Sequence, residues 1–207
     1  VMVGFVLAGS IFLFSGTRAR QNARFNDVGP NLNGLAFLQG NPQFTEDKGT
    51  PDATDNVTID LNDDWPLIEW LRNNVQGSPV IVEAVGPLYH WTGRISEYTG
   101  LPAVIGWDYH QTQQRADYTG LISERRQETA MFYSTPDTSF AEQYLLKYNV
   151  SYVVVGTEER VFGTSEAIAN FDHIPALTKV FSDGRYAIYH VDPGKLPPPS
   201  TELVQAG

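Results

Sequence analysis

The sequence has no cysteine, and this absence excludes disulfide bonds and thiolate metal sites from all 207 residues. Only 4 histidines are present, and no two of them have the spacing of a zinc site. Positive charge is also scarce: the chain has 14 Lys and Arg but 24 Asp and Glu, which gives a formal net charge of −10. Nucleic-acid binding requires clustered positive charge, so we expect no nucleic-acid partner.

Motifs of cofactor-dependent and hydrolytic enzymes are missing as well. No dinucleotide fingerprint, nucleophile elbow or HExxH motif occurs in the chain. The run Gly156-Thr157-Glu158-Glu159 follows an apolar stretch, but its two carboxylates stand where a phosphate would bind. We interpret this run as a helix cap, and we expect neither a cofactor nor a metal.

Charge of either sign is absent from the N-terminal segment VMVGFVLAGSIFLFSG, residues 1–16. A helix of this length covers about 24 Å, whereas a bilayer core is roughly 30 Å thick. We therefore predict that 1–16 is the truncated end of a transmembrane helix. A secretory signal peptide fits less well, because no basic region or cleavage site brackets the segment. The cluster Arg18, Arg20 and Arg24 would by itself place the following domain in the cytoplasm.

The remaining residues are enough for one well-cored domain. Gly, Pro, Asn and Asp are frequent before Asp64 and no hydrophobic period holds, so 17–63 is predicted to be a connector with one short element at GLAFLQ. A soluble α/β domain is expected over 64–192. Residues 193–207, with three consecutive prolines, are predicted to form a disordered tail.

Local patterns predict the elements of the domain. Capping residues, Pro66 and an apolar face indicate a helix that ends before Gly77, and two further helices are expected over 121–133 and after Asp137. Alternation around Asp183-Gly184 predicts a C-terminal β-hairpin. Short β-branched runs indicate buried strands, so we expect a mixed, largely parallel sheet with flanking helices. These runs are 79–85, 102–107 and 151–156.

The densest run of functional side chains follows the second of these runs. In open α/β sheets ligands bind beyond the carboxyl ends of the strands, where this segment would lie. Aromatic rings offer flat faces to a sugar, glutamines supply donors and acceptors, and arginine can bind phosphate. The alternative is a solvated loop with one buried Trp. The candidate binding residues are Trp107, His110, Gln111, Gln114 and Arg115.

Glu83 lies inside the apolar stretch VIVEAV, where an unpaired carboxylate would be costly to bury. We therefore expect Arg94 or Arg115 close to it. The pair could contact a ligand or could simply hold the loops to the sheet. His110 is interpreted as a hydrogen-bonding residue rather than a base.

Three segments together resemble a known family. They are GRISEYTGLPAVIGWDYHQTQQR (93–115), DWPLIEWLRNNVQGSPVIVEA (64–84) and YLLKYNVSYVVVGTEER (144–160). Over residues 31–191 the chain resembles the C-terminal extracytoplasmic portion of the YYY-type (chlor-archaeal) multi-span membrane proteins, which are related to the GT-C class of glycosyltransferases. The matching residues are Glu83, Gly93, Arg94, Gly100, Pro102, Gly106, Trp107, His110, Gln111, Gln114 and Arg115.

GT-C enzymes take a sugar from a polyprenyl-phosphate donor at the outer membrane face, and their catalytic carboxylate usually lies in an early outer loop that has no counterpart in this chain. The resemblance thus implies an extracytoplasmic domain at the cell membrane that helps to bind the donor or its acceptor and is inactive alone. It also implies membrane lipid and other transmembrane helices or subunits as partners. We prefer this orientation to the one that the three arginines indicate. The alternative is a non-catalytic, membrane-anchored binding or assembly module.

Overall fold

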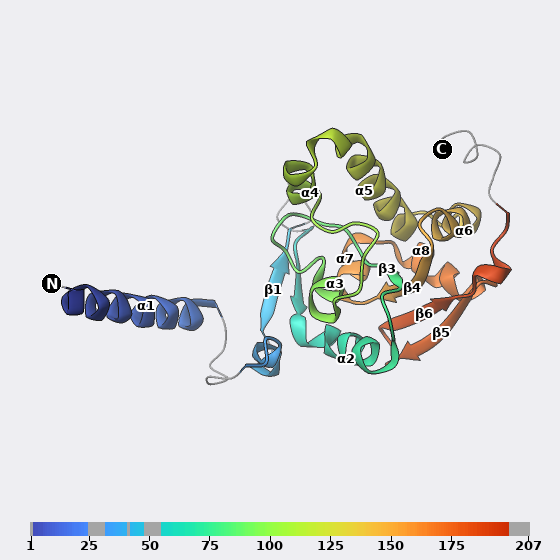
Figure 1. The fold of residues 1–207 in the computed structure, drawn as a ribbon. Coiled ribbons are helices and arrows are strands. Elements are labelled where there is room, and N and C mark those ends of the chain that lie inside the picture. The colour runs from blue at the N-terminus through green and yellow to red at the C-terminus, as the bar shows by residue number, and fades with distance from the viewer. Residues whose placement is uncertain (1, 25–31, 41, 48–54, 199–207) are drawn as a thin grey trace.

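The computed structural model describes residues 2–24, 32–40, 42–47 and 55–198. It consists of a mixed four-stranded sheet, a separate two-stranded hairpin and, within these residues, eight α-helices. Helix α1 (Met2–Arg24) stands apart from the α/β domain in Figure 1. The predicted α/β class is therefore confirmed.

The central sheet has the strand order β3 (Val80–Val82), β4 (Val150–Val155), β6 (Ala187–Val191) and β5 (Leu177–Ser182). Only β3 and β4 are parallel, whereas β6 is antiparallel to both β4 and β5. The prediction of a largely parallel sheet was wrong, because the C-terminal hairpin supplies half of the strands. That hairpin itself is confirmed, and Gly184 gives its turn a φ of 100°.

The predicted strand over 102–107 is also corrected. This segment forms one isolated parallel bridge, between Ala103 and Ile81. Pro102 lacks the N–H group that a longer ladder would need, and the chain turns into helix α4 (Asp108–Gln114) directly afterwards. The segment nevertheless follows β3 closely enough to bring Trp107 beside the end of that strand.

Side chains alternate between the two faces of the sheet, and each face has its own core. On one face, Val82 and Val153 pack with residues of α5 (Thr119–Ser134), α6 (Thr138–Lys147) and α8 (Ser165–Asn170). On the other face, Ile81 and Val154 pack against α2 (Trp65–Asn74) and α3 (Arg94–Thr99). The domain thus has three layers, and α7 (Thr157–Phe162) follows the end of β4 (Figure 1).

The N-terminal helix is confirmed, but its predicted transmembrane character is not. Among the described residues, no helix combines the length and the apolar character that crossing a membrane requires. The reason lies in the sequence of α1, whose apolar part ends at Gly16 and is followed by a polar stretch with three arginines.

The predicted connector contains more structure than its sequence indicated. The short element at GLAFLQ is confirmed as the 3₁₀ helix η1 (Ala36–Gly40). Beyond it, β1 (Gln43–Glu46) pairs with β2 (Val57–Asp60), and the 3₁₀ helix η3 (Leu61–Asp64) leads into α2. Leu35, Leu38 and Ile59 are buried, so this region packs with the α2–α3 side of the core.

The C-terminal segment begins with an ordered turn. The 3₁₀ helix η6 (Pro193–Lys195) is capped by Asp192, and Leu196 packs against the core. Residues 199–207 lie outside the described residues. The predicted disordered tail therefore starts within a folded part of the chain.

Candidate functional site

An ion-pair network lies where the parallel strands β3 and β4 end. Arg94, at the start of α3, is only 1% exposed. Its Nε donates to Asp64 at 2.8 Å, its Nη2 donates to Glu159 at 2.7 Å, and its Nη1 lies 3.6 Å from Glu83. The predicted pairing of Glu83 with Arg94 is thus confirmed. We call Asp64, Glu83, Arg94 and Glu159 the buried ion network.

Backbone groups complete the bonding of Glu83. Its two carboxylate oxygens accept from the N–H groups of Ile95 at 3.0 Å and Ser96 at 2.9 Å, in the first turn of α3. Burial raises the pKa of Glu83 to about 7, although Arg94 and these N–H groups oppose the shift. Glu83 therefore holds α3 to the end of β3.

Asp64 and Glu159 connect the network to other segments. Asp64 accepts from Trp91 Nε1 at 2.8 Å and from the N–H of Thr157 at 3.0 Å. Burial opposes its ionisation, but Arg94 holds the pKa of Asp64 below its ordinary value. Gly156 passes so close to the network that a β-carbon there would collide with Asp64 and Arg94.

This network fills the position where ligands usually bind in α/β proteins. Glu83 and Arg94 are both nearly inaccessible to solvent. The burial of Glu83 and Arg94 favours the structural interpretation, in which they hold loops to the sheet, over the interpretation that they contact a ligand. A ligand at this edge must contact groups farther out.

A further buried carboxyl group, Glu158, lies beside the network. Its side chain is 0% exposed and neither of its oxygens has a hydrogen-bond partner within the described structure. Burial raises the pKa of Glu158 to about 9, and the neighbouring Glu46 contributes in the same direction. Glu46 itself contacts His90 Nδ1 and accepts from the N–H of Trp91 at 3.4 Å. Sequence reasoning treated Glu158 only as part of a helix cap.

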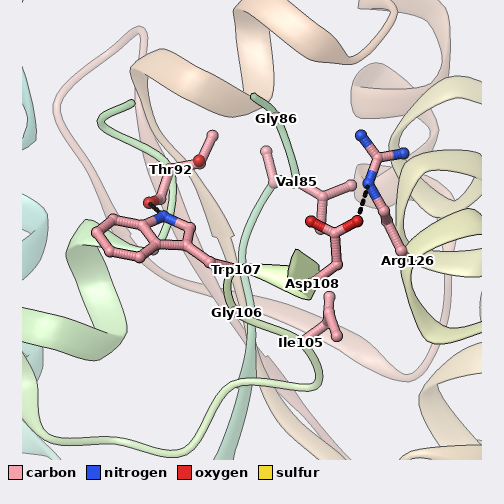
Figure 2. A pocket seen from close by; sticks show the side chains of 10 residues that line it. Val85, Gly86, Thr92, Ile105, Gly106, Trp107, Asp108 and Arg126 are labelled. Carbon is pink, nitrogen blue, oxygen red and sulfur yellow. Dashed lines mark hydrogen bonds and ion pairs between the residues drawn. The ribbon is translucent and has the colours of Figure 1, made fainter. Parts of the chain in front are cut away.

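Outside the network, three aromatic side chains form what we call the aromatic platform: Tyr89, Trp107 and His110. Ring centroids lie 5.5 Å apart for Tyr89 and Trp107, 5.2 Å for Tyr89 and His110, and 5.5 Å for Trp107 and His110. Trp107 Nε1 donates to the carbonyl of Thr92 at 3.0 Å, which fixes the indole (Figure 2). Tyr109 adds a fourth ring, 6.3 Å from His110, and is half exposed.

Tyr89 is the most unusual member of the platform. Its side chain is 66% exposed although it contacts two rings. Its backbone has a φ of 62°, in the left-handed region that residues other than glycine adopt at a cost. The fold thus holds an exposed aromatic ring in a strained position, which is typical of a functional residue.

A small cavity lies beside Trp107 of the platform. Trp107 borders it on one side, and on the other Asp108 forms an ion pair with Arg126 at 3.2 Å (Figure 2). Its volume of about 10 Å³ is enough for one water-sized group. Gly86 forms part of the wall, and a β-carbon there would come within 2.8 Å of Thr92 and Phe162.

The structure separates the residues that the sequence singled out into three groups. Trp107 and His110 belong to the platform, and Gln111 follows on α4 with its side chain close to Gly106. Gln114 and Arg115 are exposed at the C-terminal end of α4. Glu83 and Arg94 belong to the buried ion network. Sequence reasoning missed Tyr89, although the aromatic run Tyr89-His90-Trp91 before Gly93 was a possible signal.

The platform offers aromatic ring faces and hydrogen-bonding groups. Within the described residues, no three His, Asp or Glu side chains are arranged to hold a metal ion. No model of a known protein family and no curated protein matches this chain. The clues to a ligand are therefore the partly exposed rings, followed along α4 by Gln111, Gln114 and, at its end, Arg115.

Proposed function

We propose that this chain contributes a non-catalytic saccharide-binding domain to a membrane-associated, GT-C-like glycosyltransferase. The aromatic platform would hold the sugar of a polyprenyl-phosphate donor or of its acceptor. The observation that carries the proposal is the strained and exposed Tyr89, which stands beside the fixed indole of Trp107.

Sugar rings present apolar C–H faces and polar edges, so proteins bind them with aromatic rings surrounded by hydrogen-bonding groups. Tyr89 and Trp107 offer such rings, and the Tyr89 hydroxyl lies 3.4 Å from His110 Nε2. Gln114 and Arg115 are exposed at the end of the same helix that carries His110. Arg115 forms no ion pair within the described part of the chain, so its guanidinium is free to bind a phosphate.

Three carboxylates near the platform are engaged by arginines, which favours a binding role over a catalytic one. The GT-C enzymes that the chain resembles use a catalytic carboxylate, which must lie within reach of the reacting groups. Glu83 and Glu159 are buried and bonded to Arg94, and Asp108 is paired with Arg126. The catalytic group of the proposed enzyme would then come from another part of the protein, as the family resemblance implies.

Helix α1 supports the membrane association. Its apolar side chains are largely exposed, and no other part of the described structure covers them. We propose that they contact membrane lipid or other membrane helices, with the α/β domain on the extracytoplasmic side. The most exposed of these side chains are Val3, Ile11, Phe12, Leu13 and Phe14.

A second candidate function is an assembly module or accessory subunit of a membrane complex. The exposed side chains of α1 are as compatible with an assembly module as with the saccharide-binding domain. In an assembly module, the buried ion network would serve only to hold the domain together. This candidate gives the platform no ligand. Saccharide binding at Tyr89 therefore distinguishes the two.

The test is binding of polyprenyl-phosphate mannose and glucose to the full chain, measured by isothermal titration calorimetry. Tyr89→Ala should weaken binding about tenfold, which corresponds to the loss of ~1.4 kcal/mol of contact. Tyr118→Ala serves as a matched control, because Tyr118 is an exposed tyrosine that contacts no ring of the platform. Equal affinity of wild type and Tyr89→Ala, or no binding at all, would favour the assembly module.

A further inference from the structure

A groove separate from the aromatic platform is bordered by α2, by α3 and by residues 32–35. Two adjoining hollows, of about 140 and 450 Å³, share Leu35 and Arg72 in their walls. Neither shares a residue with the cavity below Trp107. The larger hollow is shallow and open to solvent. We call the two together the α2–α3 groove.

Helix α2 supplies one wall of the groove. Trp65, Glu69 and Arg72 are spaced as i, i+4 and i+7 and so lie along one face of this helix. Leu67 and Leu71, between them in sequence, are buried in the core. The groove therefore borders the edge of the core, against which Trp65 also packs.

Helix α3 supplies the opposite wall through Glu97 and Tyr98. Tyr98 is held in place by Trp91, whose ring centroid lies 5.7 Å from its own. Trp91 comes from the same loop as Tyr89 of the platform. One short loop thus supports aromatic rings at both places.

The polar groups of the groove are available to a ligand. Within the described residues, no side-chain hydrogen bond or ion pair engages Glu69, Arg72 or Glu97. Glu69 and Glu97 would repel an anionic ligand, and Arg72 would repel a cationic one. Together with the rings of Trp65 and Tyr98, these donors and acceptors suit a neutral ligand rich in hydroxyl groups.

We infer that the α2–α3 groove is a second saccharide-binding site of the domain, distinct from the platform. The inference rests on the proposed function in one respect, because it assumes that both sites bind the same class of ligand, a saccharide. Recognition at the groove depends on Arg72 and its neighbours on α2, and not on the platform.

The experiment follows backbone amide shifts by NMR in the full, isotope-labelled chain. The protein is kept in a phosphocholine detergent, because a maltoside would itself present sugar. Manno-, gluco- and galacto-oligosaccharides, from monosaccharides to hexasaccharides, are titrated. We expect shifts over Glu69 to Asn73 and at Tyr98, and we expect Arg72→Ala combined with Asn73→Ala to weaken this binding at least about tenfold.

Both substituted residues are exposed on a helix, so the variant should fold. Lys195→Ala removes the same charge from an exposed position and should change nothing. Shifts at α4 and Tyr89 alone would support the platform and overturn the inference. Shifts at the groove alone would support the inference and overturn the proposed function. Shifts at neither place, or shifts with detergent only, would overturn both.

Discussion

Glu158 allows the clearest test of the structure, because it is a carboxyl group that is buried without a partner. Its ordinary pKa is 4.5, and burial raises the value in the folded protein to about 9. Folding therefore retains a proton on Glu158 that the unfolded chain releases above pH 4.5. This contribution to stability is fully present below pH 4.5 and is lost as the pH rises toward 9.

The magnitude follows from the difference between the two pKa values. Each pH unit between them costs about 1.36 kcal/mol, so at pH 8 the wild type should have lost on the order of 5 kcal/mol of unfolding free energy. Glu158→Gln keeps the shape of the neutral acid and cannot release a proton. At pH 8 the variant should therefore be more stable than the wild type by up to this amount, and near pH 4.5 the two should be similar.

The assay is urea unfolding followed by circular dichroism across this pH range. Glu166→Gln is the matched control, because Glu166 is an exposed glutamate on α8. Glu83, with its pKa raised to about 7, adds pH dependence in the same direction, and both proteins retain it. If wild type and Glu158→Gln lose stability in parallel as the pH rises, Glu158 does not hold a proton in the folded state and the reasoning fails.

Three further substitutions test other parts of the structure. Gly156→Ala should lower the unfolding free energy by several kcal/mol in urea titrations, because the added β-carbon would collide with the buried ion network. Gly120→Ala is the control: its β-carbon meets no atom within 4 Å, and the change should stabilise α5 slightly. A Gly156→Ala protein as stable as wild type would contradict the close packing there. Asp137→Ala should cost about 1 kcal/mol in the same assay, since its side chain accepts from Ser139 and Phe140 at the start of α6, and an unchanged value would show that the cap contributes nothing. Arg115→Ala should weaken binding of a polyprenyl-phosphate sugar by about 1.5–3 kcal/mol in calorimetry with folding unchanged, and equal affinity would exclude this arginine from the phosphate site.

Much of the fold followed from local sequence patterns. Strand β4, helices α5 and α6, the Asp137 cap and the β5–β6 hairpin lie close to where their residues predicted them. Strand β4 and helix α6 have an apolar pattern of their own, and the hairpin has a turn signal. Hairpin β1–β2 has neither, because its four-residue strands are mostly polar, and its apolar side chains Phe44 and Ile59 pack against the distant core.

The candidate site was predictable to a smaller degree. The pairing of Glu83 with Arg94 followed from the cost of a lone buried charge, which holds in any fold. The exposure of Tyr89 and the burial of Glu158 could not be predicted from the sequence, because both depend on how separate segments pack. The segment 102–107 has the composition of a strand, but the proline at its start and the turn after it limit it to one bridge.

The buried ion network also has a consequence for how the domain folds. Arg94 lies 30 residues from Asp64 and 65 from Glu159 in the sequence, so its bonds close long loops. Charged groups stay hydrated until their partners arrive, and we expect these contacts to form after the folding transition state. Interactions absent from the transition state act mainly on the unfolding rate. The network would then prolong the lifetime of the folded domain without making it fold faster.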